Sequence, residues 1–376
     1  MTGGLRVLLA PDKFKGSLPA SGVAAAVGRG LVSQRRDVEP VVLPVADGGD
    51  GTLDAAISAG FERVPIRVSG PTGEPVATAY ARRGPVAVIE MADACGLVRL
   101  PGGMQAPLTA SSRGVGEAVL AALDAGCDEV VLGIGGSAST DGGAGLLEAL
   151  GARLLDASGA ALGAGGGALA SLAELDLAGV HPAVAKARFV VACDVDNPLL
   201  GPSGAAAVYG AQKGAGPEDM AVLDAALAHW ADVVADRVGG DVRAAAGAGA
   251  AGGVGFAALA VLGADMRPGI ELMLDLVGFD EHLPGSALVV TGEGSLDEQS
   301  LRGKAPVGVA RRAAAAGVPV VAVCGRRQLG TDALQAAGIR AAYALLDHEP
   351  DPEVCMREPA PLLERLGATI ARDHLP

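Results

Sequence analysis

Aromatic residues make up only 2% of this 376-residue chain, and cysteine occurs only five times. The cysteines are widely spaced, odd in number and free of any C-x-x-C pair, which excludes a disulfide framework and a zinc knuckle. We therefore predict a reducing, cytoplasmic location. The 50% hydrophobic share, with 19% charged residues, excludes intrinsic disorder and predicts a folded protein. The cysteines are Cys95, Cys127, Cys193, Cys324 and Cys355.

Positive charge is scarce, because 29 Lys and Arg residues stand against 43 Asp and Glu residues, for a net charge of −14. Non-specific nucleic-acid binding needs an excess of Lys and Arg to hold phosphate, so no nucleic-acid partner is expected. A small anionic ligand would need a local field from Lys, Arg, a metal ion or helix N-termini.

We expect neither a secretory leader nor a membrane span in this chain. Met1–Ala10 has no charged stretch ahead of a long apolar core and no cleavage signal, which argues against a secretory peptide. Residues 244–264 carry no charge, but most of them are Ala and Gly, which partition weakly into hydrocarbon. We interpret this segment as a buried loop and helix, and we expect no membrane association.

Short apolar runs rich in β-branched residues do occur, and each is followed at once by Gly or an acid. Ala-rich stretches with helical spacing separate most of them, which predicts an α/β fold with largely parallel sheets. Ligands of such sheets bind beyond the carboxyl ends of the strands, where these Gly and acidic clusters fall. The strand-like runs are 6–10, 41–45, 129–132, 189–192, 287–290 and 318–323, and the helical stretches include 20–31, 115–125, 220–238 and 307–316.

Residues 61–90 break this alternation. Three short strand-like runs there are separated by turn signals rather than by a helix. This pattern is typical of an antiparallel meander and predicts a second sheet or domain inserted after the first βαβα unit.

The loop at residues 133–143 follows a strand and precedes a helix, and five of its eleven residues are Gly. Backbone amides of Gly135 and Gly136, with hydroxyls of Ser137 and Thr140 and the acid Asp141, form a candidate phosphate cradle. The alternative is a tight structural turn. No Walker A motif, G-x-x-x-x-G-K-[ST], occurs in the chain.

The same loop admits a dehydrogenase interpretation. Gly133, Gly135 and Ala138 satisfy G-x-G-x-x-A, and Asp156 lies near the position of a ribose-binding acid. The residues after Ala138 delay the helix that should begin inside such a motif, which disfavours a nicotinamide dinucleotide.

Acids follow the first two strand-like runs. Asp12 and Lys15 are placed to orient a hydroxyl and to neutralise an acid substrate, whereas Lys13 fits a solvated turn better. Asp47 and Asp50 could bind Mg²⁺, or Asp50 could simply cap the helix that follows.

Five further candidate residues lie later in the chain. Asp194 ends an apolar strand, and Thr291, Gly292 and Glu293 again combine hydroxyl, Gly and acid after a strand. Lys213 is either a phosphate contact or part of an exposed helix end. None of the five histidines falls in these loops, so proton transfer is assigned to carboxylates.

Several segments together, in their order and spacing from about Val7 to Ile370, resemble the bacterial glycerate kinase family. These segments are Ala10-Pro11-Asp12, Pro44-Val45-Ala46-Asp47-Gly48-Gly49, Gly133-Ile134-Gly135-Gly136-Ser137, Ala192-Cys193-Asp194-Val195, Gln212-Lys213-Gly214-Ala215, Gly247-Ala248-Gly249-Ala250-Ala251-Gly252-Gly253 and Thr291-Gly292-Glu293-Gly294.

The resemblance implies two α/β domains, one Rossmann-like and discontinuous with a parallel sheet and one inserted with a mixed sheet, and an active site in the cleft between them. Applied to this chain, the domains would span 1–60 with 281–376, and 61–280. The implied activity is ATP-dependent phosphorylation of D-glycerate with Mg²⁺, with the 2-hydroxyl favoured. A dehydrogenase of a small hydroxy acid and a non-catalytic small-acid binding protein are the alternatives.

Phosphoryl transfer needs an anion cradle, a metal that offsets charge, and a group that orients the attacking hydroxyl. We expect Asp194 to be the base, with Asp12 as a substitute, and Lys15 to bind the glycerate carboxylate. Asp47 and Asp50 are the expected metal ligands. The expected nucleotide and phosphate contacts are Gly135, Gly136, Ser137, Thr140, Asp141, Thr291, Gly292 and Glu293.

Overall fold

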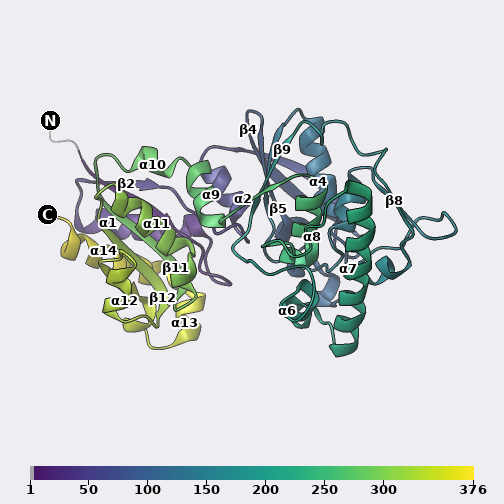
Figure 1. The fold of residues 1–376 in the computed structure, drawn as a ribbon. Coiled ribbons are helices and arrows are strands. Elements are labelled where there is room, and N and C mark those ends of the chain that lie inside the picture. Colours follow the sequence, from purple (N-terminus) through teal and green to yellow (C-terminus); the bar gives the residue numbers. More distant parts are fainter. Residues whose placement is uncertain (1–3) are drawn as a thin grey trace. The chain divides into compact units, whose positions relative to one another are not determined.

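The chain forms two compact units in a computed structural model, which describes residues 4–376 apart from the side chain of Arg302. Unit 1 comprises the residues up to Asp47, Asp54–Gly60 and Ile270–Pro376. Unit 2 comprises Gly48–Leu53 and Phe61–Gly269. Each unit has its own sheet and core, so each is described separately (Figure 1).

Unit 1 is built on a five-stranded parallel sheet in the order β13-β12-β11-β1-β2. Successive residues of β1 point to opposite faces, and both faces are covered, so Val7 to Ala10 are all fully buried. This explains why the strands read as continuous apolar runs. The strands are β1 (Leu5–Pro11), β2 (Val38–Val42), β11 (Ser286–Leu296), β12 (Val320–Arg327) and β13 (Ala341–Ala344).

Two helical layers cover this sheet. One core contains residues of α1 and α14, and the other contains residues of α9, α11 and α12. A Cβ at Gly30 would lie 2.0 Å from the Glu364 carbonyl oxygen, so only glycine lets α1 and α14 approach this closely. The helices are α1 (Ala20–Gln34), α2 (Thr52–Ser58), α9 (Gly269–Leu276), α10 (Phe279–His282), α11 (Ala305–Ala315), α12 (Thr331–Ala336), α13 (Pro352–Arg357) and α14 (Pro359–His374).

Unit 2 is built on a six-stranded mixed sheet in the order β10-β9-β6-β5-β4-β3. Strands β5, β6, β9 and β10 run parallel, whereas β3, β4 and β5 form the antiparallel meander predicted for residues 61–90. The strands are β3 (Glu62–Ser69), β4 (Pro75–Arg83), β5 (Val86–Glu90), β6 (Glu129–Gly133), β9 (Arg188–Ala192) and β10 (Asp265–Arg267), with a separate ribbon of β7 (Arg153–Leu155) and β8 (Glu174–Asp176).

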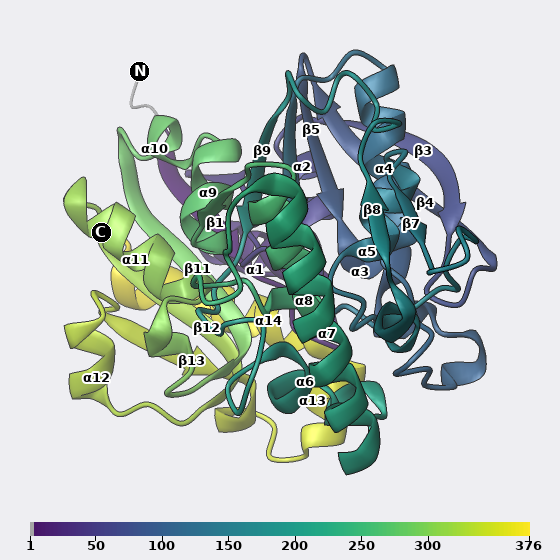
Figure 2. The same ribbon diagram turned by 45° about the vertical axis from the view of Figure 1, so that its right-hand side comes forward.

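The long helix α7 lies beside α8 in both ribbon views (Figure 2). The ring of Trp230 on α7 meets the ring of Phe256 on α8 edge to face. Helix α8 lies within the uncharged segment 244–264 and is mostly buried, as predicted. In the described residues, no helix is long and apolar enough to cross a membrane. The helices of this unit are α3 (Met91–Cys95), α4 (Arg113–Asp124), α5 (Ala144–Ala149), α6 (Ala205–Tyr209), α7 (Pro217–Val238) and α8 (Ala250–Ala260).

The α/β fold class with one parallel and one mixed sheet is therefore confirmed, but some strand ends are not where the sequence placed them. Strand β11 continues to Leu296, so Thr291, Gly292 and Glu293 lie within a strand rather than in a loop after it. Strand β2 ends at Val42, although the amides of Leu43 and Val45 still donate to carbonyls of β1.

Candidate active site

In unit 2, three of the predicted segments meet at the carboxyl ends of β6 and β9. Gly133 and Ala192, the last residues of these strands, are paired neighbours in the sheet. The segment that begins at Gly48 lies against both strand ends: a Cβ at Gly48 would be 2.6 Å from the Ala192 Cβ, and the Gly135 amide nitrogen is 3.5 Å from the Gly48 carbonyl oxygen. Parallel strands thus bring distant loops to one edge of the sheet.

Gly136 and Asp50 are neighbours at this edge. A Cβ at Gly136 would lie 3.0 Å from Asp50 Oδ1 and 3.1 Å from the Ala92 Cβ, and Gly136 has a φ of +72°. Both the space and the backbone conformation therefore require glycine here. The structure places the half-buried Asp50 carboxylate directly beside the glycine loop.

Glu90, to which the sequence analysis gave no role, ends β5 and pairs with Gly133. Its buried carboxylate accepts from the amides of Leu53 and Gly51 at 3.0 to 3.2 Å, at the start of α2. Burial raises the pKa of Glu90 to about 7, although the two amides lower it. The sequence pattern could have indicated Glu90 as a candidate, since Glu90 is an acid at the end of an apolar run.

Asp141 is 1% exposed, and both of its carboxylate oxygens accept internal hydrogen bonds. Oδ2 accepts from the Ser112 amide at 2.7 Å, the Ser112 hydroxyl at 2.9 Å and the Gly145 amide at 3.3 Å, and Oδ1 accepts from the Gly143 amide at 3.2 Å. The side chain thus ties the starts of α4 and α5 together. We interpret Asp141 as a structural residue of the loop; its predicted nucleotide contact stays a prediction.

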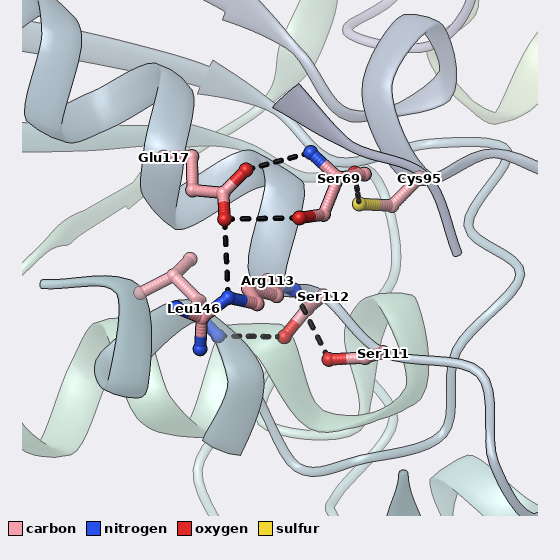
Figure 3. A network of polar contacts seen from close by, with 7 residues as sticks. All are labelled: Ser69, Cys95, Ser111, Ser112, Arg113, Glu117 and Leu146. Carbon is pink, nitrogen blue, oxygen red and sulfur yellow. Dashed lines mark hydrogen bonds and ion pairs between the residues drawn. The ribbon is translucent and has the colours of Figure 1, made fainter. Parts of the chain in front are cut away.

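The start of α4 belongs to a wider polar network (Figure 3). Glu117 accepts from the Ser69 amide at 2.6 Å, the Ser69 hydroxyl at 3.0 Å and Arg113 Nε at 3.0 Å. The Ser112 hydroxyl, which donates to Asp141, accepts from the Leu146 amide at 3.0 Å. These contacts hold the starts of α4 and α5 in place next to the glycine loop.

Three hydroxyls of the glycine loop are buried, and the ammonium of Lys213 is buried against them. Lys213, on the short helix Ala211–Lys213, donates through Nζ to Ser137 Oγ at 2.8 Å and to the Ser139 carbonyl oxygen at 2.5 Å. The hydroxyls of Ser139 and Thr140 are fully buried and have no hydrogen-bond partner among the described residues. Lys213 is therefore not at an exposed helix end, which was one of its two predicted interpretations.

Asp194 lies two residues beyond β9 and is exposed. Its Oδ1 accepts from the amide of Gly269 at 2.7 Å, at the first residue of α9. Nearby, Asn197 is buried, and its Nδ2 has no partner in the described chain. Asp194 thus has a structural contact and an exposed carboxylate, and either could explain its position.

In unit 1, the predicted residues gather where β1 ends, beside the middle of β11, since Pro11 is paired with Gly292. The Asp12 amide donates to the Gly292 carbonyl at 2.8 Å, and the buried Thr291 hydroxyl donates to the Ala10 carbonyl at 2.9 Å. Asp12 itself is buried. Burial, with the charge of Asp47 as the next cause, raises the pKa of Asp12 to about 7.

Glu293 adds a third carboxylate to this end of the sheet. Its Oε1 is buried without a hydrogen-bond partner among the described residues, and burial raises the pKa of Glu293. Lys15 is exposed, with its amide 3.5 Å from the place where a Cβ of Gly294 would lie. An acid with a raised pKa is suited to proton transfer near neutral pH.

The two predicted metal ligands fall in different units, Asp47 in unit 1 and Asp50 in unit 2. Within residues 4–376, no three His, Cys, Asp or Glu side chains are grouped in a way that could hold a metal ion. This does not conflict with Mg²⁺, which usually takes only one or two protein carboxylates and completes its shell with water and substrate phosphates.

The dehydrogenase interpretation gains nothing from the geometry. Helix α5 begins at Ala144, well after the G-x-G-x-x-A motif, and Asp156 is engaged by its own turn. The Asp156 carboxylate accepts from the amides of Ser158 and Ala160 at 2.8 and 3.0 Å.

Comparison with known proteins decides between a kinase, a dehydrogenase and a non-catalytic binding protein. The glycerate kinase family model matches residues 7–375 of the chain. The chain belongs to the glycerate kinase family. It is 43% identical to a glycerate kinase of Bacillus subtilis (strain 168) over 98% of this chain and 97% of that protein, and 43% identical to a glycerate 2-kinase of Escherichia coli (strain K12) over 91% of each.

A solved structure described as a glycerate kinase 2 from Salmonella typhimurium LT2 aligns with a TM-score of 0.86 at 39% identity, over 98% of both chains. The predicted family, fold class and phosphotransferase activity are thereby confirmed. The dehydrogenase and the non-catalytic binding protein are not favoured.

Proposed function

We propose that this glycerate kinase family member transfers the terminal phosphoryl group of ATP to the 2-hydroxyl of D-glycerate. The observation that carries this is the meeting of the 48–50 and 133–137 segments at the carboxyl ends of β6 and β9. Buried hydroxyls of the glycine loop and the buried ammonium of Lys213 lie at the same place. The name of the Escherichia coli relative, a glycerate 2-kinase, supports the 2-hydroxyl.

In this proposal the glycine loop holds phosphate oxygens. Gly135 and Gly136 allow close backbone approach, and the hydroxyls of Ser137 and Thr140 donate to phosphate. Gly292 and Glu293 remain proposed nucleotide contacts from unit 1. Thr291 is a weaker candidate, because its hydroxyl already donates to Ala10.

Asp194 is the proposed base, since its exposed carboxylate stands at a strand end where a substrate hydroxyl can reach it. Asp12 is its substitute, with a pKa near neutrality. Lys15 is exposed and could bind the glycerate carboxylate. No histidine is required.

We further propose that a magnesium ion arrives with the nucleotide, because Mg²⁺ takes carboxylate and phosphate oxygens as ligands. Asp50, beside Gly136, and Asp47 would supply oxygen ligands, and the ion would offset the charge of the phosphates. A chain with a net charge of −14 has few other means of doing so. The cytoplasmic location stays a prediction from composition.

The proposal is tested by ADP release in the presence and absence of D-glycerate and of divalent metal. We expect ADP release that depends on glycerate, and a fall of roughly 100-fold or more in excess chelator, restored by Mg²⁺ or Mn²⁺. Full activity in chelator would contradict the metal assignment. ADP release that does not depend on glycerate would contradict the proposal that glycerate is the substrate.

A further inference from the structure

Lys213 is unusual because its charged end is buried. The side chain is 2% exposed, whereas lysine ammonium groups ordinarily reach water. In the described part of the chain both of its hydrogen-bond acceptors, Ser137 Oγ and the Ser139 carbonyl oxygen, are neutral. A buried cation without an anionic hydrogen-bond partner is costly, so some other interaction should offset that cost.

The hydrogen-bond count around Lys213 shows more donors than acceptors. The ammonium has three N–H groups, and two acceptors are described for it. Ser137 Oγ accepts from Lys213, which leaves its own proton for another acceptor. The hydroxyls of Ser139 and Thr140, fully buried, add two donors without partners among the described residues. An anion rich in oxygen would supply acceptors for these donors and would offset the charge of the ammonium.

The position of this cluster indicates which anion it takes. Ser137 directly follows Gly136, where an added Cβ would lie 3.0 Å from Asp50 Oδ1 and 3.1 Å from the Ala92 Cβ. Three members of the cluster therefore belong to the loop proposed to hold phosphate, and Lys213 contacts that loop. A nucleotide phosphate supplies both the charge and the acceptor oxygens that the cluster lacks.

We propose that Lys213 is a positioning residue for the nucleotide phosphates, which holds the Ser137 hydroxyl as a donor and places a positive charge against the glycine loop. This inference rests on the proposed function. It differs from a purely structural role, in which the ammonium would only hold the loop through Ser139.

The charge state of Lys213 gives a readout that a purely structural residue would not. Burial lowers the pKa of Lys213 to about 7, and the nearby carboxylate of Asp141 acts in the opposite direction. From the other side the neutral Gln105 packs on the 212–214 turn. Lys213 thus loses its charge as the pH rises through about 7, and binding of a phosphate anion should weaken over the same range.

The experiment measures ATP affinity by calorimetry with Mg²⁺ and without glycerate, at pH 6.5 and 8.5. For wild type we expect affinity to fall roughly tenfold between the two. Lys213→Met should bind roughly 30-fold more weakly at pH 6.5 and lose most of the pH dependence. Ser137→Ala should bind ATP roughly fivefold more weakly than wild type and should keep the pH dependence. Lys186→Met removes an exposed lysine of the same unit and should match wild type.

Folded Lys213→Met with wild-type affinity at both pH values would overturn the inference. If that variant does not fold, unchanged affinity in Ser137→Ala would overturn it instead. Failure of the proposed function is separate: wild type that binds ATP with this pH dependence but does not phosphorylate glycerate would contradict the substrate and leave the role of Lys213 intact. Wild type that does not bind ATP would contradict both.

Discussion

Asp194→Asn is expected to lower kcat for glycerate phosphorylation by roughly 100-fold or more while the melting temperature changes little. The asparagine keeps an oxygen that can accept from the Gly269 amide, the contact that the aspartate makes at 2.7 Å. It removes the negative charge and the basicity on which proton transfer depends. The substitution therefore separates the two explanations for this position.

Asp194→Ala completes the test, since it removes the acceptor as well. We expect the same loss of kcat, with an added loss of about 1 kcal/mol in stability from the lost contact at the start of α9. Asp196→Asn, in the same exposed loop, is the matched control and should keep wild-type kcat. Near-wild-type kcat in Asp194→Asn would make the residue structural and move the base to Asp12.

Asp141→Ala should destabilise unit 2 by about 3 to 5 kcal/mol, because it leaves four buried donors from Ser112, Gly143 and Gly145 without their acceptor. Denaturant unfolding followed by the fluorescence of Trp230, which lies in unit 2, measures this loss.

Asp236→Ala is the control for that experiment. Asp236 is an exposed acid on α7 in the same unit, and its removal should change stability by less than about 0.5 kcal/mol. Unfolding of Asp141→Ala at the wild-type denaturant concentration, with loss of ATP affinity, would instead support the nucleotide contact predicted from the sequence.

The positions of the loops were easier to predict from the sequence than the role of each side chain in them. Apolar runs followed by Gly or acid placed Gly133 and Asp194 at the ends of β6 and β9, because parallel strands buried on both faces have that signature. The role of Asp141 could not be predicted, since its donors at Ser112 lie 29 residues away in the chain.

Lys213 illustrates the same limit. Local sequence could not decide between a phosphate contact and an exposed helix end, because its contacts with Ser137 and Ser139 are more than 70 residues distant. The length of strand β11 was underestimated for a different reason. Gly292 and Gly294 are poor strand formers, yet pairing with β12 carries the strand on to Leu296.

The most direct test of the central claim is to identify the product of the reaction with ATP, Mg²⁺ and D-glycerate by ³¹P NMR. Phosphorus on the 2-hydroxyl couples to the single proton on C2, whereas phosphorus on the 3-hydroxyl couples to the two protons on C3. We expect a doublet that grows with the ADP signals, which identifies 2-phosphoglycerate. A triplet would contradict the 2-hydroxyl, and the absence of any phosphoglycerate signal would contradict the proposed function itself.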